Sequence, residues 1–354
     1  GYAFPNAPGD TGDFSQLGEG FFQSVDTRMQ RLWELGLVVA AHPDWLVAQN
    51  VTLAQAEAVS HNLLARYGAY SIVWSLTGEF QVAPASGHPE WAASDWAQLR
   101  ELGAFVAAHN PYRHPLSVHP GGSDEGAPTF GQQSSAHFFH DEPWLDHNWL
   151  QTYVHDDKVA FRVQEAYAYL PSKPVVESEP CYESYSFTWP WTGFCDAEMA
   201  RRQAWTAMLW GAAGHVYGAE GLYYCDDLSA LDLAGSTELS YLGSLLRSVD
   251  WSRLVPTTAC VAQNGAVPDP SALDPFAPSC AAVPGELYVL YFPAGTQGDS
   301  FEARALAGRT YVASFFNPRS GTSIPINGGD PVNDDENDTW TIPARPDSQD
   351  WVCV

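Results

Sequence analysis

The hydrophobic and polar positions of the chain alternate between two patterns up to about residue 250. Six segments place apolar residues at helical spacing: 21–35, 52–67, 91–109, 156–170, 197–213 and 239–249. Six short apolar runs between them predict buried strands: 37–41, 70–80, 114–118, a run within 136–151, 174–176 and 214–224. Strands that alternate with helices in this way predict a parallel sheet with helical crossovers, which is the α/β class.

The pattern changes after Trp251. Segments such as 285–295 and 309–321 are short β-branched and aromatic runs between Gly, Pro and Asn turns, as in an antiparallel β-sandwich. We therefore predict a β/α barrel at 1–251 and a β-sandwich domain at 252–354. A closed (β/α)8 TIM-type barrel needs eight β/α units, and only six are visible, so we expect the two N-terminal units to be missing. A further N-terminal segment or a separate chain would then complete the barrel.

Charge restricts the partners of this protein. Lys and Arg number 16 against 42 Asp and Glu, a formal net charge of -26, so we expect no binding to nucleic acid or to anionic membranes. No apolar run approaches the roughly 18 residues of a membrane-spanning helix, and no membrane insertion is expected. The acidic stretch 330–338 lacks the spacing of an EF-hand calcium loop. A solvated loop is the favoured interpretation there, and we predict neither a metal nor a cofactor.

Cysteine usage and two glycosylation motifs favour an extracellular protein. The six cysteines have no CxxC spacing, which favours disulfides over a zinc or redox site. Closing a loop of about 15 residues stabilises a fold by roughly 3 kcal/mol, so we predict two disulfides within short loops, Cys181–Cys195 and Cys260–Cys280. The pairing of the other two cysteines stays open. Asn50 and Asn337 begin N-glycosylation motifs, which together with disulfides predict a secreted glycoprotein.

Two glutamates at the ends of predicted strands are candidates for catalysis. Glu79 ends the run at 70–80, and Glu179 follows the run at 174–176, two residues beyond Glu177. Hydrolysis of a glycosidic bond needs two carboxyl groups, one to protonate the leaving oxygen and one to attack or to activate water. Glu79 and Glu179 are therefore the predicted pair. Glu177 and Glu183 remain alternatives to Glu179, and any of these glutamates could instead hold an arginine or cap a helix.

Further residues near predicted strand ends supply the donors, acceptors and ring faces that a sugar needs. These candidates for substrate binding are His42, Trp45, His119, Asp146, Gln151, Tyr182, Trp189, His215 and Tyr217. The 14 tryptophans suit a sugar-binding cleft, although most tryptophans in a protein fill its core.

The chain carries five motifs that, in this order, resemble the apiosidase-like glycoside hydrolases. They are TGE at 77–79, WLDHNWLQ at 144–151, KPVVESEPCYES at 173–184, RRQAWTAMLWGAAGHVYG at 201–218, and a terminal β domain with YFPAG, FFNPRSG and DWVCV. The resemblance extends from about Phe21 to Val354. It implies a (β/α)8 barrel of a large clan of retaining enzymes, followed by a domain that is often labelled collagen-binding.

The same resemblance implies Glu79 as the acid/base, after strand 4 of the family's barrel, and Glu179 as the nucleophile, after strand 7. Many relatives have Asp in a Gly-Gly-Asp context where this chain has Thr77-Gly78-Glu79, so the carboxylate is kept on a longer side chain.

Two function classes follow from these observations. The first is a secreted retaining glycoside hydrolase that acts on a plant, algal or other cell-surface polysaccharide. The second is a non-catalytic structural or glycan-binding extracellular protein built on the same barrel. An incomplete barrel favours the second class because it leaves sheet edges open, whereas the retained pair of carboxylates favours the first.

Overall fold

A computed structural model of the chain describes residues 18–42, 51–81, 96–122, 134–188, 192–223, 227–296, 300–335 and 337–354. Contacts divide the chain into two compact units. The N-terminal unit comprises residues 1–151 and 169–174, and the C-terminal unit comprises residues 152–168 and 175–354. Among the helices so described, none is long and apolar enough to cross a membrane.

The N-terminal unit contains a parallel sheet of three strands in the order β1-β2-β3. In the register, Trp74 lies between Ala41 and Leu116. The strands of this unit are β1 (Val39–Ala41), β2 (Ile72–Ser75), β3 (Leu116–Ser117) and β4 (Asn148–Leu150). Its helices are α1 (Glu19–Glu34), α2 (Leu53–Tyr67), α3 (Ala97–His109) and α4 (Ser135–Phe139). One apolar core joins these helices to the sheet.

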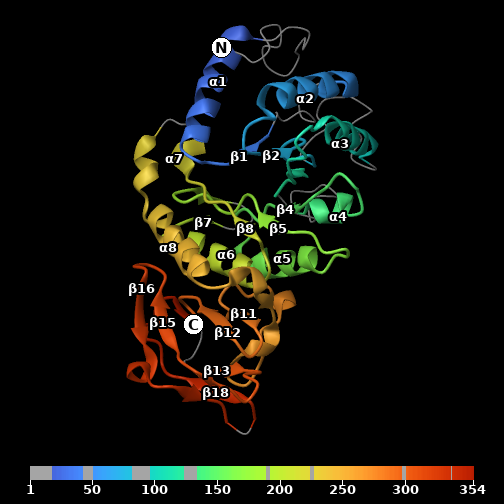
Figure 1. The fold of residues 1–354 in the computed structure, drawn as a ribbon. Helices are drawn as coiled ribbons and strands as arrows, with labels where there is room; N and C mark the ends of the chain where they lie inside the picture. The colour runs from blue at the N-terminus through green and yellow to red at the C-terminus, as the bar shows by residue number, and fades with distance from the viewer. Residues whose placement is uncertain are drawn as a thin grey trace. The chain divides into compact units, whose positions relative to one another are not determined.

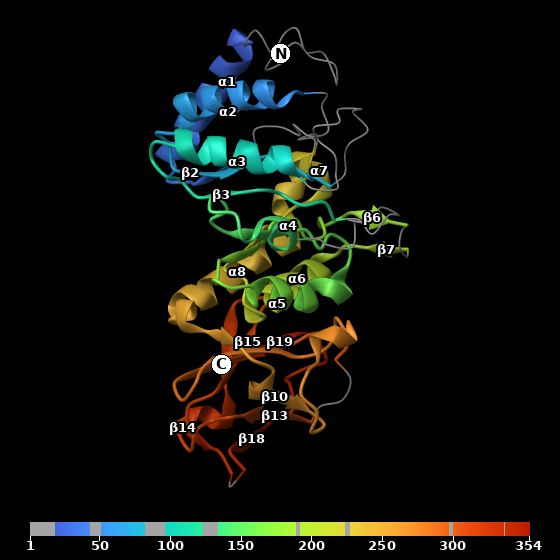
Figure 2. The same cartoon turned by 90° about the vertical axis from the view of Figure 1, so that its right-hand side faces the viewer.

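Helix α2 begins where the sequence predicts. The Thr52 hydroxyl accepts the Gln55 N–H at 3.3 Å, and the Gln55 side-chain oxygen accepts the Thr52 N–H at 2.8 Å. This reciprocal capping box satisfies two N–H groups that a helix start leaves without partners, and the predicted cap is confirmed. Helices α2 and α3 lie side by side (Figures 1 and 2).

In the C-terminal unit, β5 (Val175–Glu177) and β8 (Gly214–His215) pair in parallel, with Glu177 opposite His215. A short hairpin follows β5, formed by β6 (Ser186–Phe187) and β7 (Gly193–Phe194). The helices here are α5 (Val159–Tyr167), α6 (Ala197–Leu209), α7 (Glu220–Tyr223) and α8 (Ala234–Ser248). α5 and α6 pack against each other (Figure 2).

The predicted strand at 214–224 is wrong beyond His215. The chain leaves the strand there and forms the helical turn α7 instead. A Cβ on Gly218 would lie 2.3 Å from the ring of Tyr182, so the backbone passes this ring only because residue 218 is a glycine. The Glu183 carbonyl then accepts the N–H of Glu220, and these contacts with a distant segment replace a longer strand.

The C-terminal part of this unit consists of antiparallel sheets, as predicted. The six-stranded sheet has the order β16-β15-β19-β12-β11-β9, the three-stranded sheet has the order β10-β13-β18, and β14 pairs with β17. Both larger sheets contribute side chains to one core, which is the arrangement of a sandwich.

The strands of these sheets are short. They are β9 (Val255–Pro256), β10 (Val261–Gln263), β11 (Ser279–Val283), β12 (Leu287–Phe292), β13 (Phe301–Arg304), β14 (Thr310–Tyr311), β15 (Ser314–Asn317), β16 (Thr322–Pro325), β17 (Val332–Asn333), β18 (Thr339–Ile342) and β19 (Trp351–Cys353).

The other face of the six-stranded sheet is covered by helices. Trp205 on α6 is fully buried and stacks on Tyr291 of β12 with ring centroids 5.8 Å apart. Leu242 and Leu246 of α8 belong to the same cluster. The central strands β11 and β12 of this sheet are therefore buried on both faces, which explains the nearly continuous apolar run of β12.

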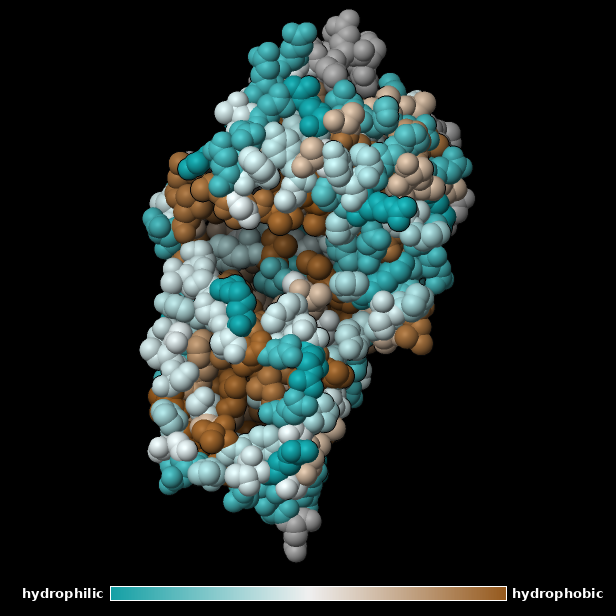
Figure 3. Space-filling view, in the orientation of Figure 1, coloured by the Kyte–Doolittle hydropathy of each residue, from teal (hydrophilic) through white to brown (hydrophobic). Residues whose placement is uncertain are grey.

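An apolar pocket of about 210 Å³ opens beside the C-terminus, among β12, β13, β15 and β19. Figure 3 shows hydrophobic side chains gathered on the lower half of the visible face, where Figure 1 draws β12, β15 and the C-terminus. The two tyrosine hydroxyl groups of the pocket are already engaged, because Tyr288 donates to the Ala305 carbonyl and Tyr311 donates to the Leu306 carbonyl at 2.7 Å.

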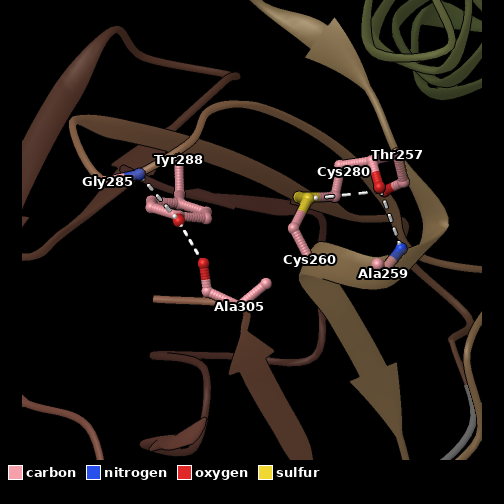
Figure 4. Close-up of a disulfide and its surroundings, with 7 residues drawn as sticks. All are labelled: Thr257, Ala259, Cys260, Cys280, Gly285, Tyr288 and Ala305. Atoms are coloured by element: carbon pink, nitrogen blue, oxygen red, sulfur yellow. Dashed lines mark hydrogen bonds between the residues drawn. A yellow bond between two sulfur atoms is a disulfide. The ribbon is translucent and has the colours of Figure 1, made fainter. Parts of the chain in front are cut away.

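The structure pairs Cys260 with Cys280 in a disulfide, as the sequence predicts (Figure 4). The predicted bond between Cys181 and Cys195 is not formed. These two thiols lie buried next to each other in an apolar cluster, where a hydrogen bond to Cys181 and burial raise the pKa of Cys195. Cys353 is a buried free thiol, and Cys225 lies outside the described residues.

Six strands of the α/β part occupy the positions that the hydrophobic pattern predicts. They are β1, β2, β3, β4, β5 and β8, and of these β1, β2, β3 and β8 are shorter than the apolar runs that predict them. The parallel pairings β1–β2 and β2–β3 of the N-terminal unit and the parallel pairing of β5 with β8 confirm the α/β class. The predicted absence of two further units stays a prediction.

Candidate active site

The carboxyl ends of β1 to β4 bring polar side chains of the N-terminal unit together. His42 follows β1, Glu79 lies four residues beyond β2, His119 lies two residues beyond β3, and Gln151 follows β4 directly. Loops at the carboxyl ends of parallel strands are where α/β proteins place their functional residues. Four of the predicted site residues therefore share one edge of this unit.

Glu79 is fixed by its neighbours at this edge. The Gln151 side-chain amide donates to Glu79 Oε1 at 2.9 Å. The backbone of the same loop is fixed against the loop after β3, because Phe80 N–H donates to the His119 carbonyl and His119 N–H donates to the Thr77 carbonyl, both at 3.2 Å. Glu79 has a φ of 34°, a left-handed conformation that costs free energy in a residue other than glycine. The surrounding loop contacts hold this conformation in place.

Three rings lie close together at the edge of the N-terminal unit that carries Glu79. The Trp149 ring on β4 lies 5.1 Å from the His42 ring and 5.9 Å from the His119 ring, and the two histidine rings are 5.2 Å apart. Trp149 was missed as a candidate from the sequence. Its signal is the alternation of a strand, because Trp149 lies two positions before Gln151 and so on the same face.

Gln151 is held by a close contact with Gly122. A Cβ on Gly122 would lie 2.6 Å from Gln151 Cγ, so only glycine fits beside this side chain. The neighbouring Gly121 N–H donates to the side chain of Gln81, a second residue that the sequence patterns do not single out. The contact with Gly122 limits the rotamers of the Gln151 amide that holds Glu79.

Asp146 lies apart from the other predicted site residues of this unit. It precedes β4, and its carboxylate accepts the N–H of Leu116, the first residue of β3, at 2.8 Å. The amino ends of parallel strands lie opposite their carboxyl ends, so this contact keeps Asp146 away from Glu79 and Gln151. In the structure, the Asp146 carboxylate holds the backbone at the start of β3.

In the C-terminal unit, the glutamate that ends β5 and the two that follow it occupy three different environments. Glu177 is the last residue of β5 and is fully buried. Glu179 is half-buried, and its carbonyl accepts the Tyr153 N–H at 3.0 Å. Glu183 is buried at a contact with the start of α8. Of the three, only Glu179 is partly exposed to solvent.

Glu183 is occupied by structural contacts. Its Oε2 accepts the Tyr217 hydroxyl at 2.5 Å and the Gly235 N–H at 3.0 Å. Gly235 lies in the first turn of α8, where N–H groups have no partner within the helix. Glu183 therefore acts as a helix cap, which argues against it as a nucleophile and also engages the hydroxyl of Tyr217.

Glu177 and His215 are both perturbed by burial. Burial raises the pKa of Glu177 to about 7. Hydrogen bonds from the Thr152 N–H, the Thr152 side chain and the Glu179 N–H oppose this rise in pKa, and the nearby charge of Glu179 adds to it. Burial lowers the pKa of His215 to about 3. Both side chains are consequently neutral in mildly acidic solution.

The remaining predicted residues are placed as follows. Tyr182 packs its ring against the backbone of Gly218, and Asn337 is exposed in a turn. Trp45, Asn50 and Trp189 lie outside the described residues. Within the parts of the chain that the structure describes, no group of three or more His, Cys, Asp or Glu side chains is arranged to hold a metal ion.

Comparison with solved structures defines the class of this fold. A structure described as a glycoside hydrolase aligns with a TM-score of 0.77 and 19% identity, over 96% of this chain and 78% of its own. A family 5 glycoside hydrolase from Bacteroides vulgatus ATCC 8482 aligns with a TM-score of 0.76 and 18% identity, over 96% of this chain and 75% of its own. A third structure, from the same organism, aligns with a TM-score of 0.62 and 14% identity, over 96% of this chain and 64% of its own. The chain thus has the fold of glycoside hydrolases.

The family can be stated from the sequence itself. The family described as "Apiosidase-like, catalytic domain" matches residues 3–253, which is most of the chain. The chain therefore belongs to the apiosidase-like family, and the resemblance drawn from its motifs is confirmed. None of the curated protein sequences is significantly similar to it.

Proposed function

We propose that this protein is a retaining glycoside hydrolase in which Glu79 is the general acid/base and Glu179 is the nucleophile. The main support is the setting of Glu79, whose carboxyl group is held by the Gln151 amide at 2.9 Å beside His119. Glu179 follows a buried strand, at the position of the family motif, and keeps a partly exposed side chain. Membership of a glycoside hydrolase family supports a carbohydrate substrate.

The chemistry of the proposal has two steps. Glu79 donates its proton to the leaving oxygen while a Glu179 oxygen attacks the anomeric carbon, so that an alcohol leaves and a glycosyl ester forms. Glu79 then takes a proton from water, which attacks the same carbon and breaks the ester. This mechanism needs the two carboxyl groups about 5 to 5.5 Å apart, because no water lies between them in the first step. A crystal structure that resolves both side chains tests this distance, and a separation near about 9 Å would favour inversion.

We further propose that the protein is secreted and that its substrate is a plant, algal or other cell-surface polysaccharide. The cysteine content and the exposed Asn337 motif support an extracellular location. Expression in eukaryotic cells, followed by treatment with an endoglycosidase, should shift the mass of the secreted protein. Replacement of Asn337 and Asn50 should remove that shift.

Our first prediction concerns the two carboxyl groups. With the best substrate from a panel of aryl glycosides, Glu179→Gln should lower kcat by roughly a thousandfold or more, because no ester can form. Glu79→Gln should lower kcat by roughly 100- to 10,000-fold for poor leaving groups and much less for 2,4-dinitrophenyl glycosides, which depart without a proton.

The matched control is Glu101→Gln on the exposed face of α3, which should leave the rate unchanged. Unchanged hydrolysis by Glu179→Gln would contradict the assignment of the nucleophile. The wild-type protein could instead hydrolyse no glycoside or polysaccharide in the panel and yet migrate more slowly in a gel that contains one of the polysaccharides. That result would favour the non-catalytic glycan-binding function.

A further inference from the structure

Two buried polar atoms at neighbouring strand ends lack a hydrogen-bond partner among the residues that the structure describes. They are Glu177 Oε2 and His215 Nδ1. Glu177 ends β5 and His215 ends β8, and the two residues are opposite each other in the parallel register. Residues paired in this way leave the sheet on the same face, so the two side chains extend side by side. Buried polar atoms nearly always have a partner, and a pair of unsatisfied atoms here needs an explanation.

The other carboxyl oxygen of Glu177 is already fixed. Glu177 Oε1 accepts the Thr152 N–H at 3.1 Å, and both residues are fully buried, with 0% of their surfaces exposed. Rotation of the carboxyl group cannot bring Oε2 to solvent without breaking this bond. Oε2 is therefore held in one position, which is the condition for recognising a ligand.

The protonation states define the chemistry of the partner. Burial raises the pKa of Glu177 to about 7 and lowers that of His215 to about 3, so both groups are neutral between these values. A neutral carboxyl group donates one hydrogen bond and accepts others, and a neutral imidazole nitrogen donates or accepts one. A charged partner would be buried here without a counter-ion, which is costly. The group that fits is uncharged and both donates and accepts a hydrogen bond, and a hydroxyl group does so.

We propose that Glu177 and His215 form a subsite that binds one hydroxyl group. The hydroxyl group belongs either to a bound water molecule or to the carbohydrate substrate. Binding of a substrate hydroxyl group rests on the proposed glycosidase function. Glu177 lies two residues before Glu179, so a sugar attacked by Glu179 would carry its hydroxyl groups next to this subsite.

A crystal structure at high resolution, without substrate, tests the subsite directly. The wild-type protein should show an ordered water oxygen within hydrogen-bond distance of both Glu177 Oε2 and His215 Nδ1. Glu177→Gln should keep this water, because the amide still donates and accepts. Glu177→Leu, which is similar in size but has no polar atom, should lose it.

A series of monodeoxy aryl glycosides separates the two sources. If a sugar hydroxyl group occupies the subsite, one monodeoxy compound should have a kcat/KM roughly 10- to 100-fold below its parent in the wild-type protein, the range expected when buried partners lose a hydrogen bond. In Glu177→Leu, the kcat/KM of the parent glycoside divided by that of the monodeoxy compound should fall to about 1. In Glu177→Gln, this ratio should stay as high as in the wild-type protein. If water alone occupies the subsite, the water should remain in a complex with an intact glycoside, and no deoxy compound should distinguish Glu177→Leu from the wild type.

Other results would overturn the subsite. One is a crystal structure in which Glu177 Oε2 forms a hydrogen bond directly with another part of this chain. The other is a crystal structure without ordered density between Glu177 Oε2 and His215 Nδ1, together with the same effect of each deoxy substitution on kcat/KM in the wild type, Glu177→Gln and Glu177→Leu. These outcomes differ from a failure of the proposed function, which would appear as wild-type protein without hydrolysis or as active Glu179→Gln. The crystallographic result stands in either case, because it requires no turnover.

Discussion

Identical side chains acquire different chemistry within seven residues of this chain. Glu177 ends β5 and Glu179 and Glu183 follow it, yet the first is fully buried, the second is half-buried and the third caps a helix. Burial disfavours the charged form of a carboxyl group, whereas N–H donors favour it. Position relative to the sheet therefore decides which of the three can serve as an exposed nucleophile.

The raised pKa of Glu177 makes stability depend on pH. The folded protein releases this proton at a pKa of about 7, and the unfolded chain releases it near the ordinary value of 4.5. Between these values the unfolded chain has lost the proton while the folded protein keeps it, so the free energy of unfolding falls as pH rises from about 4.5 to about 7. The stabilising contribution is complete below pH 4.5, and about 3 kcal/mol is lost once pH exceeds the folded pKa.

We predict that Glu177→Gln removes this dependence. The glutamine cannot release a proton, so the free energy of unfolding of the variant minus that of the wild type should increase by about 3 kcal/mol between pH 4.5 and pH 8. Urea unfolding of both proteins at a series of pH values measures the difference, and the other carboxyl groups cancel in it. A difference that stays constant with pH would mean that Glu177 titrates normally in the folded protein.

At the scale of elements, the start of α8 depends on a side chain from the loop after β5. The hydrophobic spacing predicts a helix at 239–249, but α8 begins at Ala234. Glu183 accepts the N–H of Gly235, and a carboxylate at a helix N-terminus also interacts favourably with the helix dipole. A Cβ on Gly235 would lie 2.3 Å from Glu183 Oε2, so this approach requires glycine. The first turn of α8 is thus formed by a tertiary contact rather than by its own periodicity.

We predict that Glu183→Ala destabilises the protein by about 1–3 kcal/mol, because the Tyr217 hydroxyl and the Gly235 N–H lose their shared acceptor. Hydrogen exchange should be faster at residues 234–238 and unchanged in the last turns of α8. Glu183→Gln is the matched control, since it keeps an acceptor oxygen and should lose only part of the stability. Equal protection of the first turn in all three proteins would show that α8 does not need this cap.

At the scale of the whole molecule, a buried ionic network joins α6 and α8 to the antiparallel sheets of the C-terminal unit. Arg201 on α6 donates to both carboxylate oxygens of Asp350, at 2.9 and 3.0 Å, and it also pairs with Glu238 on α8. Arg319, beyond β15, donates to the same Asp350 at 2.9 Å. Asp350 is fully buried and Arg201 is 4% exposed, so neither charge can be left without its partner at low cost.

We predict that Arg201→Met destabilises the protein by about 3–5 kcal/mol, because the buried carboxylate of Asp350 and the partly buried carboxylate of Glu238 lose a charged donor. Chemical unfolding followed by far-UV circular dichroism measures this loss. Arg253→Met is the matched control: Arg253 pairs with Glu286 on the surface, and an exposed ion pair contributes little. If both substitutions have the same small effect, the network does not stabilise the C-terminal unit.

The same network bears on domain organisation. The predicted boundary at residue 251 falls within the C-terminal unit, because α6 and α8 pack on the six-stranded sheet through Trp205 and Leu242. The change in sequence pattern after Trp251 marks a change in the kind of secondary structure. Whether residues 1–251 and 252–354 fold independently stays a prediction.

The sequence by itself determined the features that depend on neighbouring residues. Helix α2 begins at its capping box, the strand ends carry the glutamates of the family motif, and the antiparallel pattern follows Trp251, because caps, periodicity and turns act over a few positions. The family followed from motifs in order, which are also local.

Tertiary structure alone decided the features that depend on distant residues. The predicted strand at 214–224 ended at His215 because Glu183 and Tyr182 meet the chain there, and Asp146 turned toward Leu116 rather than toward Glu79. Cys181 and Cys195 became neighbours without forming a bond. The burial that distinguishes Glu177 from Glu179 likewise comes from segments far away in the chain, since two residues on one side of a strand end have the same pattern but not the same surroundings.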